Sequence, residues 1–157
     1  MSLPVRSVLG VCSGNTCRSP LAAVILAARL AEAPALRDVL VSSAGTGARS
    51  GEPASEGSYL VALERGLDLS AHRSRMLTRE LVAGADLILT MGASHLRQVT
   101  DLGGADRAHL LTEWAGESAE DVDDPYGQAV EVYRETAEQL DQLMAQVVAR
   151  LQRERDA

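Results

Sequence analysis

Short apolar runs alternate with longer amphipathic segments along the chain, and this alternation predicts strands separated by helices. Apolar runs of roughly four to eight residues suit buried strands, whereas apolar positions spaced three and four apart mark one face of a helix. We therefore expect strands at 5–11, 39–43, 87–91 and 109–111. We expect helices at 19–31, 55–65, 78–83, 94–102 and 128–151.

This order of elements, joined by short connections, is typical of a parallel sheet with helices on both faces. We predict an α/β fold, a three-layer α/β/α sandwich around a central four-stranded parallel twisted sheet, with residues 1–157 forming a single domain. Such sheets bind ligands at the carboxyl ends of their strands. The segment that follows the first predicted strand is therefore the first place to look for chemistry.

Two of the helices carry predictions about burial. In the second helix we expect Tyr59, Leu60 and Leu63 to face inward, and Gly66 to end the helix in a left-handed conformation. The last helix repeats an apolar stripe at helical spacing, which we expect to face the core rather than a partner: Leu140, Leu143, Met144, Val147, Val148 and Leu151.

The segment 12–20, between the first strand and the first helix, has the residue types of a phosphate-binding loop. Gly14 and Asn15 tolerate the positive φ that a loop with converging N–H groups requires. The start of the following helix favours an anion in that concavity. Arg18 adds a planar cation that can donate two parallel hydrogen bonds to phosphoryl oxygens.

The same positive field favours Cys12 as a thiolate, which is the nucleophilic form of cysteine. Ser19 is expected at the helix start, where its hydroxyl can donate to the Cys12 sulfur, and Pro20 takes an early helical position. The alternative is that Cys12 is a small apolar residue ending a buried strand and that Arg18 is merely exposed. The glycine and asparagine between them favour the phosphate-binding loop.

Composition and charge narrow the class of partner. The 157 residues carry a formal net charge of −7 and no basic stripe, which argues against nucleic acid or an anionic membrane as a partner. No apolar stretch reaches about 18 residues, and the N-terminus lacks the pattern of a secretory signal, so we expect a cytoplasmic protein. The three histidines show no metal-ligand spacing, and no cofactor or metal is expected.

With these residues the chain resembles the low-molecular-weight protein-tyrosine-phosphatase family. That family has a Cys-x5-Arg-Ser/Thr-Pro pattern near its N-terminus, matched by 12–20, and an Asp-Pro pair far downstream, matched by Asp124-Pro125-Tyr126. The segments 43–46, 66–70 and 86–91 follow in the family's order, so the resemblance covers nearly the whole chain. It implies a protein phosphatase that acts on phosphorylated protein side chains through a phosphocysteine intermediate.

The resemblance also assigns roles. It implies that Cys12 is the nucleophile, that Arg18 binds the phosphoryl group and that Asp124 is the general acid and later the general base. Asp123 competes for that last role, but the family places its acid immediately before the proline. The residues implied to bind phosphate are Ser13, Gly14, Asn15, Thr16, Cys17, Arg18 and Ser19.

Further family features concern the support of the loop. Asn15, Ser19, Ser43 and His72 match a hydrogen-bond network that braces it. The resemblance implies that Cys17 can form a reversible disulfide with Cys12, which protects the nucleophile from over-oxidation. An equal alternative is that Cys17 is only a small buried residue behind the loop.

Two positions bear on the substrate. Thr16 matches the bacterial protein-arginine phosphatases of the family, whereas tyrosine-directed members usually carry a bulky aliphatic residue there, and Gly127 is shared with the arginine subgroup. Tyr126 supplies an aromatic pocket wall that can stack on a guanidinium or on a phenol. We favour phosphoarginine as the substrate, with phosphotyrosine as the alternative.

Two other classes are less well supported. Arsenate reductases of related fold need a further pair of cysteines to relay a disulfide, and none follows Cys17. A non-catalytic phosphate-binding module would not need Cys12, Arg18 and Asp124 together. The sequence makes no prediction about the oligomeric state.

Overall fold

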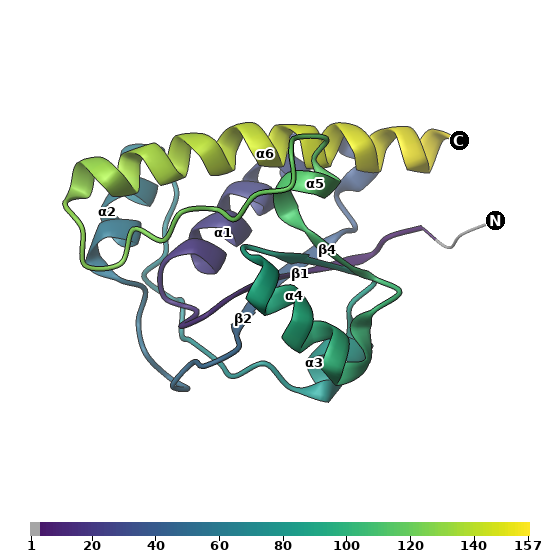
Figure 1. Cartoon of the computed structure of the whole chain (residues 1–157). Helices are drawn as coiled ribbons and strands as arrows, with labels where there is room; N and C mark the ends of the chain where they lie inside the picture. The colour runs from purple at the N-terminus through teal and green to yellow at the C-terminus, as the bar shows by residue number, and fades with distance from the viewer. Residues whose placement is uncertain (1–3) are drawn as a thin grey trace.

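Four parallel strands form the sheet that organises the molecule. The computed structural model describes residues 4–157, so residues 1–3 of the predicted domain lie outside the described part. The strands are β1 (Ser7–Cys12), β2 (Leu40–Gly45), β3 (Leu87–Thr90) and β4 (Ala108–Leu110), in the spatial order β2-β1-β3-β4. Every neighbouring pair is parallel, which confirms the predicted four-stranded parallel sheet (Figure 1).

Helices cover both faces of this sheet and complete the predicted three layers. One face packs against α1 (Arg18–Ala31), α2 (Glu56–Glu64), α5 (Leu111–Trp114), α6 (Val130–Asp156) and the short turn η1 (Pro34–Leu36). The other face packs against α3 (Arg79–Gly84) and α4 (Ala93–Val99), which runs into a wider turn, η2 (Thr100–Gly104). None of the helices described over residues 4–157 combines the length and apolarity needed to cross a bilayer.

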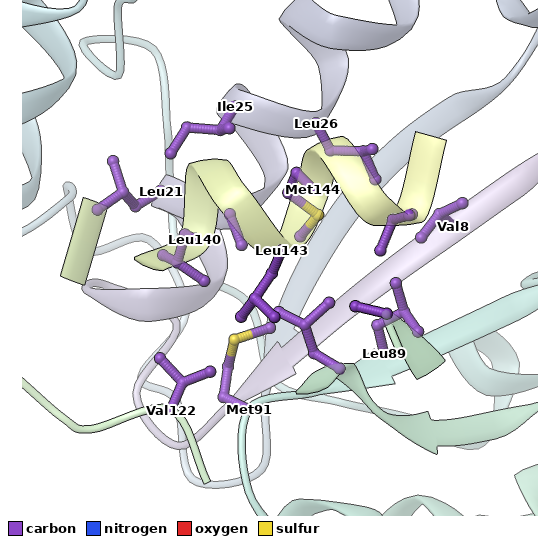
Figure 2. Close-up of a cluster of buried hydrophobic side chains, with 14 of the residues drawn as sticks. Val8, Leu21, Ile25, Leu26, Leu89, Met91, Val122, Leu140, Leu143 and Met144 are labelled. Atoms are coloured by element: carbon purple, nitrogen blue, oxygen red, sulfur yellow. The ribbon is translucent and has the colours of Figure 1, made fainter. Parts of the chain in front are cut away.

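The larger core lies between the sheet and the helix pair α1 and α6. Figure 2 shows Leu21 and Ile25 of α1 meeting Leu140 and Met144 of α6, above Leu89 of β3. The whole predicted apolar stripe of the last helix lies on this side, with Val148 only partly buried and the other five residues buried. Burial of apolar area at about 25 cal/mol per Å² makes this layer the main hydrophobic contribution to the fold.

The predicted buried face of α2 is wrong at two of its three positions, and Tyr59 is half-buried. Leu60 and Leu63 are 42% and 47% exposed, and the helix instead buries Ser58, Val61 and Ala62. Ser58 is inside because its hydroxyl donates to the carbonyl of Cys17 at 3.0 Å, which satisfies a polar group that would otherwise be costly to bury. Gly57 lets α2 lie close to α6, since a Cβ there would clash with the ring of Tyr133.

Other boundaries shift by a few residues. Helix α1 begins at Arg18 rather than at Ser19, and α6 runs to Asp156, five residues beyond the predicted end. The last turn of α6 is polar, but Arg155 fixes it by donating to the carbonyls of Ala35 and Val5. The Gly66 prediction is confirmed, because φ is +75° there and its N–H bonds back into α2.

Candidate active site

The predicted phosphate-binding loop lies at the carboxyl end of β1, between Cys12 and the start of α1 at Arg18. Asn15 has φ of +57° and is the one non-glycine residue with positive φ among residues 4–157. A left-handed conformation is unfavourable for most side chains and persists only where the surroundings impose it. The contacts of Asn15 supply that constraint.

Four hydrogen bonds hold Asn15, which is fully buried. Its Nδ2 donates to Ser19 Oγ at 2.8 Å and to Ser43 Oγ at 2.9 Å. His72 Nε2 donates to its carbonyl at 2.7 Å, so the structure brings together all the predicted bracing residues. The backbone N–H of Arg75 donates to Asn15 Oδ1 at 2.9 Å, a contact that sequence reasoning missed.

Cys12 lies buried at the end of β1, with its sulfur 2.9 Å from Ser19 Oγ. Because Ser19 Oγ already accepts a hydrogen bond from Asn15, its own proton is free to point at the sulfur. A hydroxyl donor in that position stabilises sulfur when it carries negative charge. The brace and the candidate nucleophile are therefore parts of one buried network.

Arg18 is buried and reaches toward the chain between α5 and α6, the green segment that crosses in front of α1 in Figure 1. Its Nη1 donates to the carbonyl of Val122 at 3.0 Å, and its Nη2 lies 3.5 Å from Asp124 Oδ2. The buried Nε of Arg18 has no protein partner. The guanidinium thus keeps donor capacity beside the candidate acid.

The two carboxyl oxygens of Asp124 make different contacts. Its Oδ1 accepts the N–H of Tyr126 at 3.1 Å, which is a local turn cap, while Oδ2 faces Arg18. The side chain is 48% exposed and lies on the pocket wall. Asp123 does not line that pocket.

The pocket over Cys12 has a volume of about 330 Å³. From the loop and the acid-bearing segment it is lined by Cys12, Ser13, Gly14, Thr16, Cys17, Arg18, Asp124 and Tyr126. Of the predicted phosphate-binding residues, Asn15 and Ser19 lie behind the wall and support it. Gly47, Arg49 and Glu52 complete the wall, and none of the three is among the predicted site residues.

Cys17 is buried beside α6 as well as lining the pocket. Its S–H donates to Ser55 Oγ at 3.2 Å, and its sulfur lies 3.6 Å from the Tyr133 hydroxyl. Burial, together with the hydrogen bond to Cys17, raises the pKa of Tyr133 to about 12. Both cysteines are free thiols here, and the disulfide between Cys12 and Cys17 stays a prediction.

His95 is the residue that sequence reasoning missed most clearly. Its position in the sequence carries no motif, and it was considered only as a metal ligand. It lies in the first turn of α4, is 3% exposed, and its Nε2 is 2.8 Å from Ser13 Oγ in the loop. Burial and the nearby Arg18 guanidinium lower the pKa of His95 to about 4, against the opposing effect of Asp121 and Asp124. The ring is therefore neutral at physiological pH.

The profile of the family described as low molecular weight phosphotyrosine protein phosphatase matches residues 7–157. The chain belongs to this family. It is therefore a low-molecular-weight protein phosphatase, a hydrolase that acts on phosphorylated proteins.

Relatives of both specificities are similar to it. A protein-arginine-phosphatase of Geobacillus stearothermophilus is 35% identical over 154 residues, 97% of this chain and 99% of the relative. The probable low molecular weight protein-tyrosine-phosphatase EpsP of Ralstonia solanacearum is 39% identical over 127 residues, 78% of this chain and 79% of the relative. A solved structure of YwlE arginine phosphatase, a cysteine-to-serine mutant with a phosphorylated active-site serine, matches with a TM-score of 0.88 at 33% identity, covering 96% of this chain and 98% of that one.

The arrangement brings together the parts that phosphoryl transfer requires. A sulfur at the floor, a buried guanidinium beside it and an exposed carboxyl above it all line one pocket. Within residues 4–157 no three His, Cys, Asp or Glu side chains converge in a way that would hold a metal ion.

Proposed function

We propose that this phosphatase hydrolyses phosphoarginine side chains of proteins, with Cys12 as nucleophile and Asp124 as general acid and base. The observation that carries the chemistry is the shared pocket of Cys12, Arg18 and Asp124. Support for the substrate comes from Thr16, a small polar side chain on the pocket wall, and from the arginine-phosphatase relative that matches over almost the full length of both chains.

In the first step the Cys12 thiolate attacks phosphorus and the P–N bond to the guanidine breaks. Asp124 gives its proton to the departing nitrogen, so a neutral or cationic guanidine leaves rather than an anion. Arg18 and the N–H groups of the loop hold the charge that gathers on the phosphoryl oxygens. The product is a phosphocysteine on Cys12 and a free arginine side chain.

In the second step a water molecule attacks the phosphocysteine, and the Asp124 carboxylate takes its proton. The S–P bond breaks and inorganic phosphate leaves. The Ser19 hydroxyl, 2.9 Å from the sulfur, stabilises the thiolate that departs. Cys12 reacts only as a thiolate and not as part of a disulfide, which fits a cytoplasmic location.

Two side chains of the pocket wall suit the same substrate. Glu52 lies on the wall together with Arg49, and its carboxylate can accept the N–H groups of a guanidinium. Tyr126 is 71% exposed on the same wall, so its ring is available to stack on a planar group.

The same ring supports phosphotyrosine as the alternative substrate, as does the similarity to a probable tyrosine phosphatase. The purified protein should therefore be compared on a phosphoarginine peptide and on a phosphotyrosine peptide of matched sequence. We expect a higher kcat/KM for the first, and a large preference for the second would overturn the proposed substrate.

Thr16→Ile tests the proposed basis of that choice. The larger aliphatic side chain is expected to shift the ratio of kcat/KM values toward phosphotyrosine. As a control, adding Cys12→Ser to this variant should abolish activity on both substrates. An unchanged ratio would show that Thr16 is not the residue that selects the substrate.

A further inference from the structure

The Ser13 hydroxyl, next to the nucleophile in the chain, is held from outside the loop. Its Oγ lies 2.8 Å from Nε2 of His95, which comes from the first turn of α4 on the opposite side of the sheet from α1. Ser13 lines the pocket over Cys12, whereas His95 is buried behind it. A buried side chain therefore fixes a polar group on the pocket wall.

The other ring nitrogen of His95 has no hydrogen-bond partner although it is buried. Asp121 lies nearby, but its Oδ1 accepts the N–H of Ala93 at 2.9 Å and neither oxygen forms a hydrogen bond with Nδ1. Gly92 lies close to both side chains, because a Cβ added to it would be 3.0 Å from Asp121 Oδ2 and 3.3 Å from His95 Nδ1. The charges that act on the ring are those of Arg18, Asp121 and Asp124.

These contacts decide where the proton of the neutral ring lies. A proton on Nδ1 would leave a buried N–H without an acceptor, and orphaned buried N–H groups are rare and costly. A proton on Nε2 is donated to Ser13 Oγ, and only a lone pair on Nδ1 goes unused. The Nε2–H form is therefore the more stable one in this site.

We propose that His95 donates from Nε2 to Ser13 and thereby frees the Ser13 hydroxyl proton to donate to the phosphoryl group held over Cys12. This role rests on the proposed phosphocysteine mechanism, and it leaves the bonds formed and broken in that mechanism as described above. Ser13 then touches the reacting group, and His95 is a positioning residue that acts through it. The donor adds to the charge stabilisation supplied by Arg18 and the loop N–H groups.

Kinetics on p-nitrophenyl phosphate test the pair without reference to substrate preference. Ser13→Ala and His95→Leu are each expected to lower kcat about tenfold, the effect of one hydrogen bond to a charged group. The double variant should be no slower than Ser13→Ala alone, because His95 acts only through the Ser13 hydroxyl and has nothing to position once that hydroxyl is gone. Ser94→Ala, an exposed neighbour in the same turn of α4, is the control and should keep the wild-type rate.

His95→Gln separates positioning from simple packing. Its amide N–H can reach Ser13 in place of Nε2–H, so we expect most of the rate lost in His95→Leu to return. A wild-type rate in Ser13→Ala would overturn the proposal, as would a double variant whose losses multiply.

Nitrogen-15 NMR of the His95 ring in the wild-type protein gives an answer that does not depend on any variant folding. We expect the neutral Nε2–H form at pH 7, and a neutral Nδ1–H form or a charged ring would overturn the proposal. The two proposals can also fail separately. Activity that survives Cys12→Ser would overturn the phosphocysteine mechanism, whereas the NMR spectrum reports the His95 tautomer whatever the mechanism is.

Discussion

The two halves of the active site are built in opposite ways. The loop of residues 12–19 is cross-braced from behind, with buried Asn15 held by four hydrogen bonds, one to Ser19 in the loop and three to Ser43, His72 and Arg75 outside it. The acid segment, residues 120–127, exposes most of its side chains and reaches the loop through Arg18, which contacts the Val122 carbonyl and Asp124.

This difference matches what each half has to do. The loop must present its N–H groups and the Cys12 sulfur in one fixed geometry, since preorganised donors stabilise a transition state without rearranging. The acid must give a proton to the leaving group and later take one from water, and it must let products escape. Variants in the loop should therefore change both stability and rate, and variants in the acid segment should change the rate alone.

The largest effect is expected from Asp124→Asn. Loss of the acid and base should lower kcat about 10²–10³-fold, with little change in the free energy of unfolding because the side chain is half exposed. Steady-state kinetics and urea unfolding on the same preparation measure both. Asp123→Asn is the matched control and should stay close to wild type, and the reverse ranking would give the acid role to Asp123.

Asn15→Ala should affect both properties. It removes the side-chain bonds to Ser19, Ser43 and the Arg75 N–H, and it leaves alanine in a left-handed conformation. We expect a loss of about 3 kcal/mol in the free energy of unfolding, together with a fall in kcat. Ser43→Ala, which removes one of those bonds, should cost about 1 kcal/mol. A stable Asn15→Ala protein would contradict the idea of an imposed loop.

His95 lies where the two halves meet, and it predicts a dependence of stability on pH. Its pKa falls from the ordinary 6.5 to about 4 on folding, so the unfolded chain binds the proton more readily between those values. Stability from this group is complete above pH 6.5 and is lost as the pH falls toward 4, by up to about 3 kcal/mol. Urea unfolding should show that wild type loses this free energy of unfolding relative to His95→Gln as the pH falls from 6.5 to 4. A difference between the two proteins that stays constant with pH would contradict the assignment.

The smallest effect is expected from Tyr126→Ala. The ring is 71% exposed, so its removal should leave the unfolding free energy unchanged. Loss of a stacking surface should lower kcat/KM by the equivalent of roughly 0.5–1.5 kcal/mol, and Tyr126→Phe should restore it. A loss of stability in Tyr126→Ala would show that the acid segment is not the loosely held half.

The contrast also explains what the sequence was able to predict. The loop was predictable because its signals are local: an apolar strand, then Gly14 and Asn15, then Arg18 at the start of a helix. The sheet followed from the same alternation of strand and helix patterns. Ser43 and His72 came from the family resemblance, and the structure places both against the loop.

The misses are contacts between distant segments that leave no periodic signal. His95 touches Ser13 across 82 positions, and the backbone of Arg75 meets Asn15 across 60. The exposed face of α2 was misjudged for the same reason, because the Ser58 hydroxyl finds a carbonyl acceptor that the sequence does not show. Residue type predicts burial poorly where a polar group has a specific partner.

Direct detection of phosphocysteine in Asp124→Asn tests the central claim most directly. With p-nitrophenyl phosphate the leaving group departs without a proton, whereas the water step still lacks its base, so the intermediate should accumulate. Rapid acid quenching and mass spectrometry of the peptides should find one phosphoryl group on Cys12. A protein that turns over but carries no phosphoryl group there, or carries it on another residue, would contradict the account.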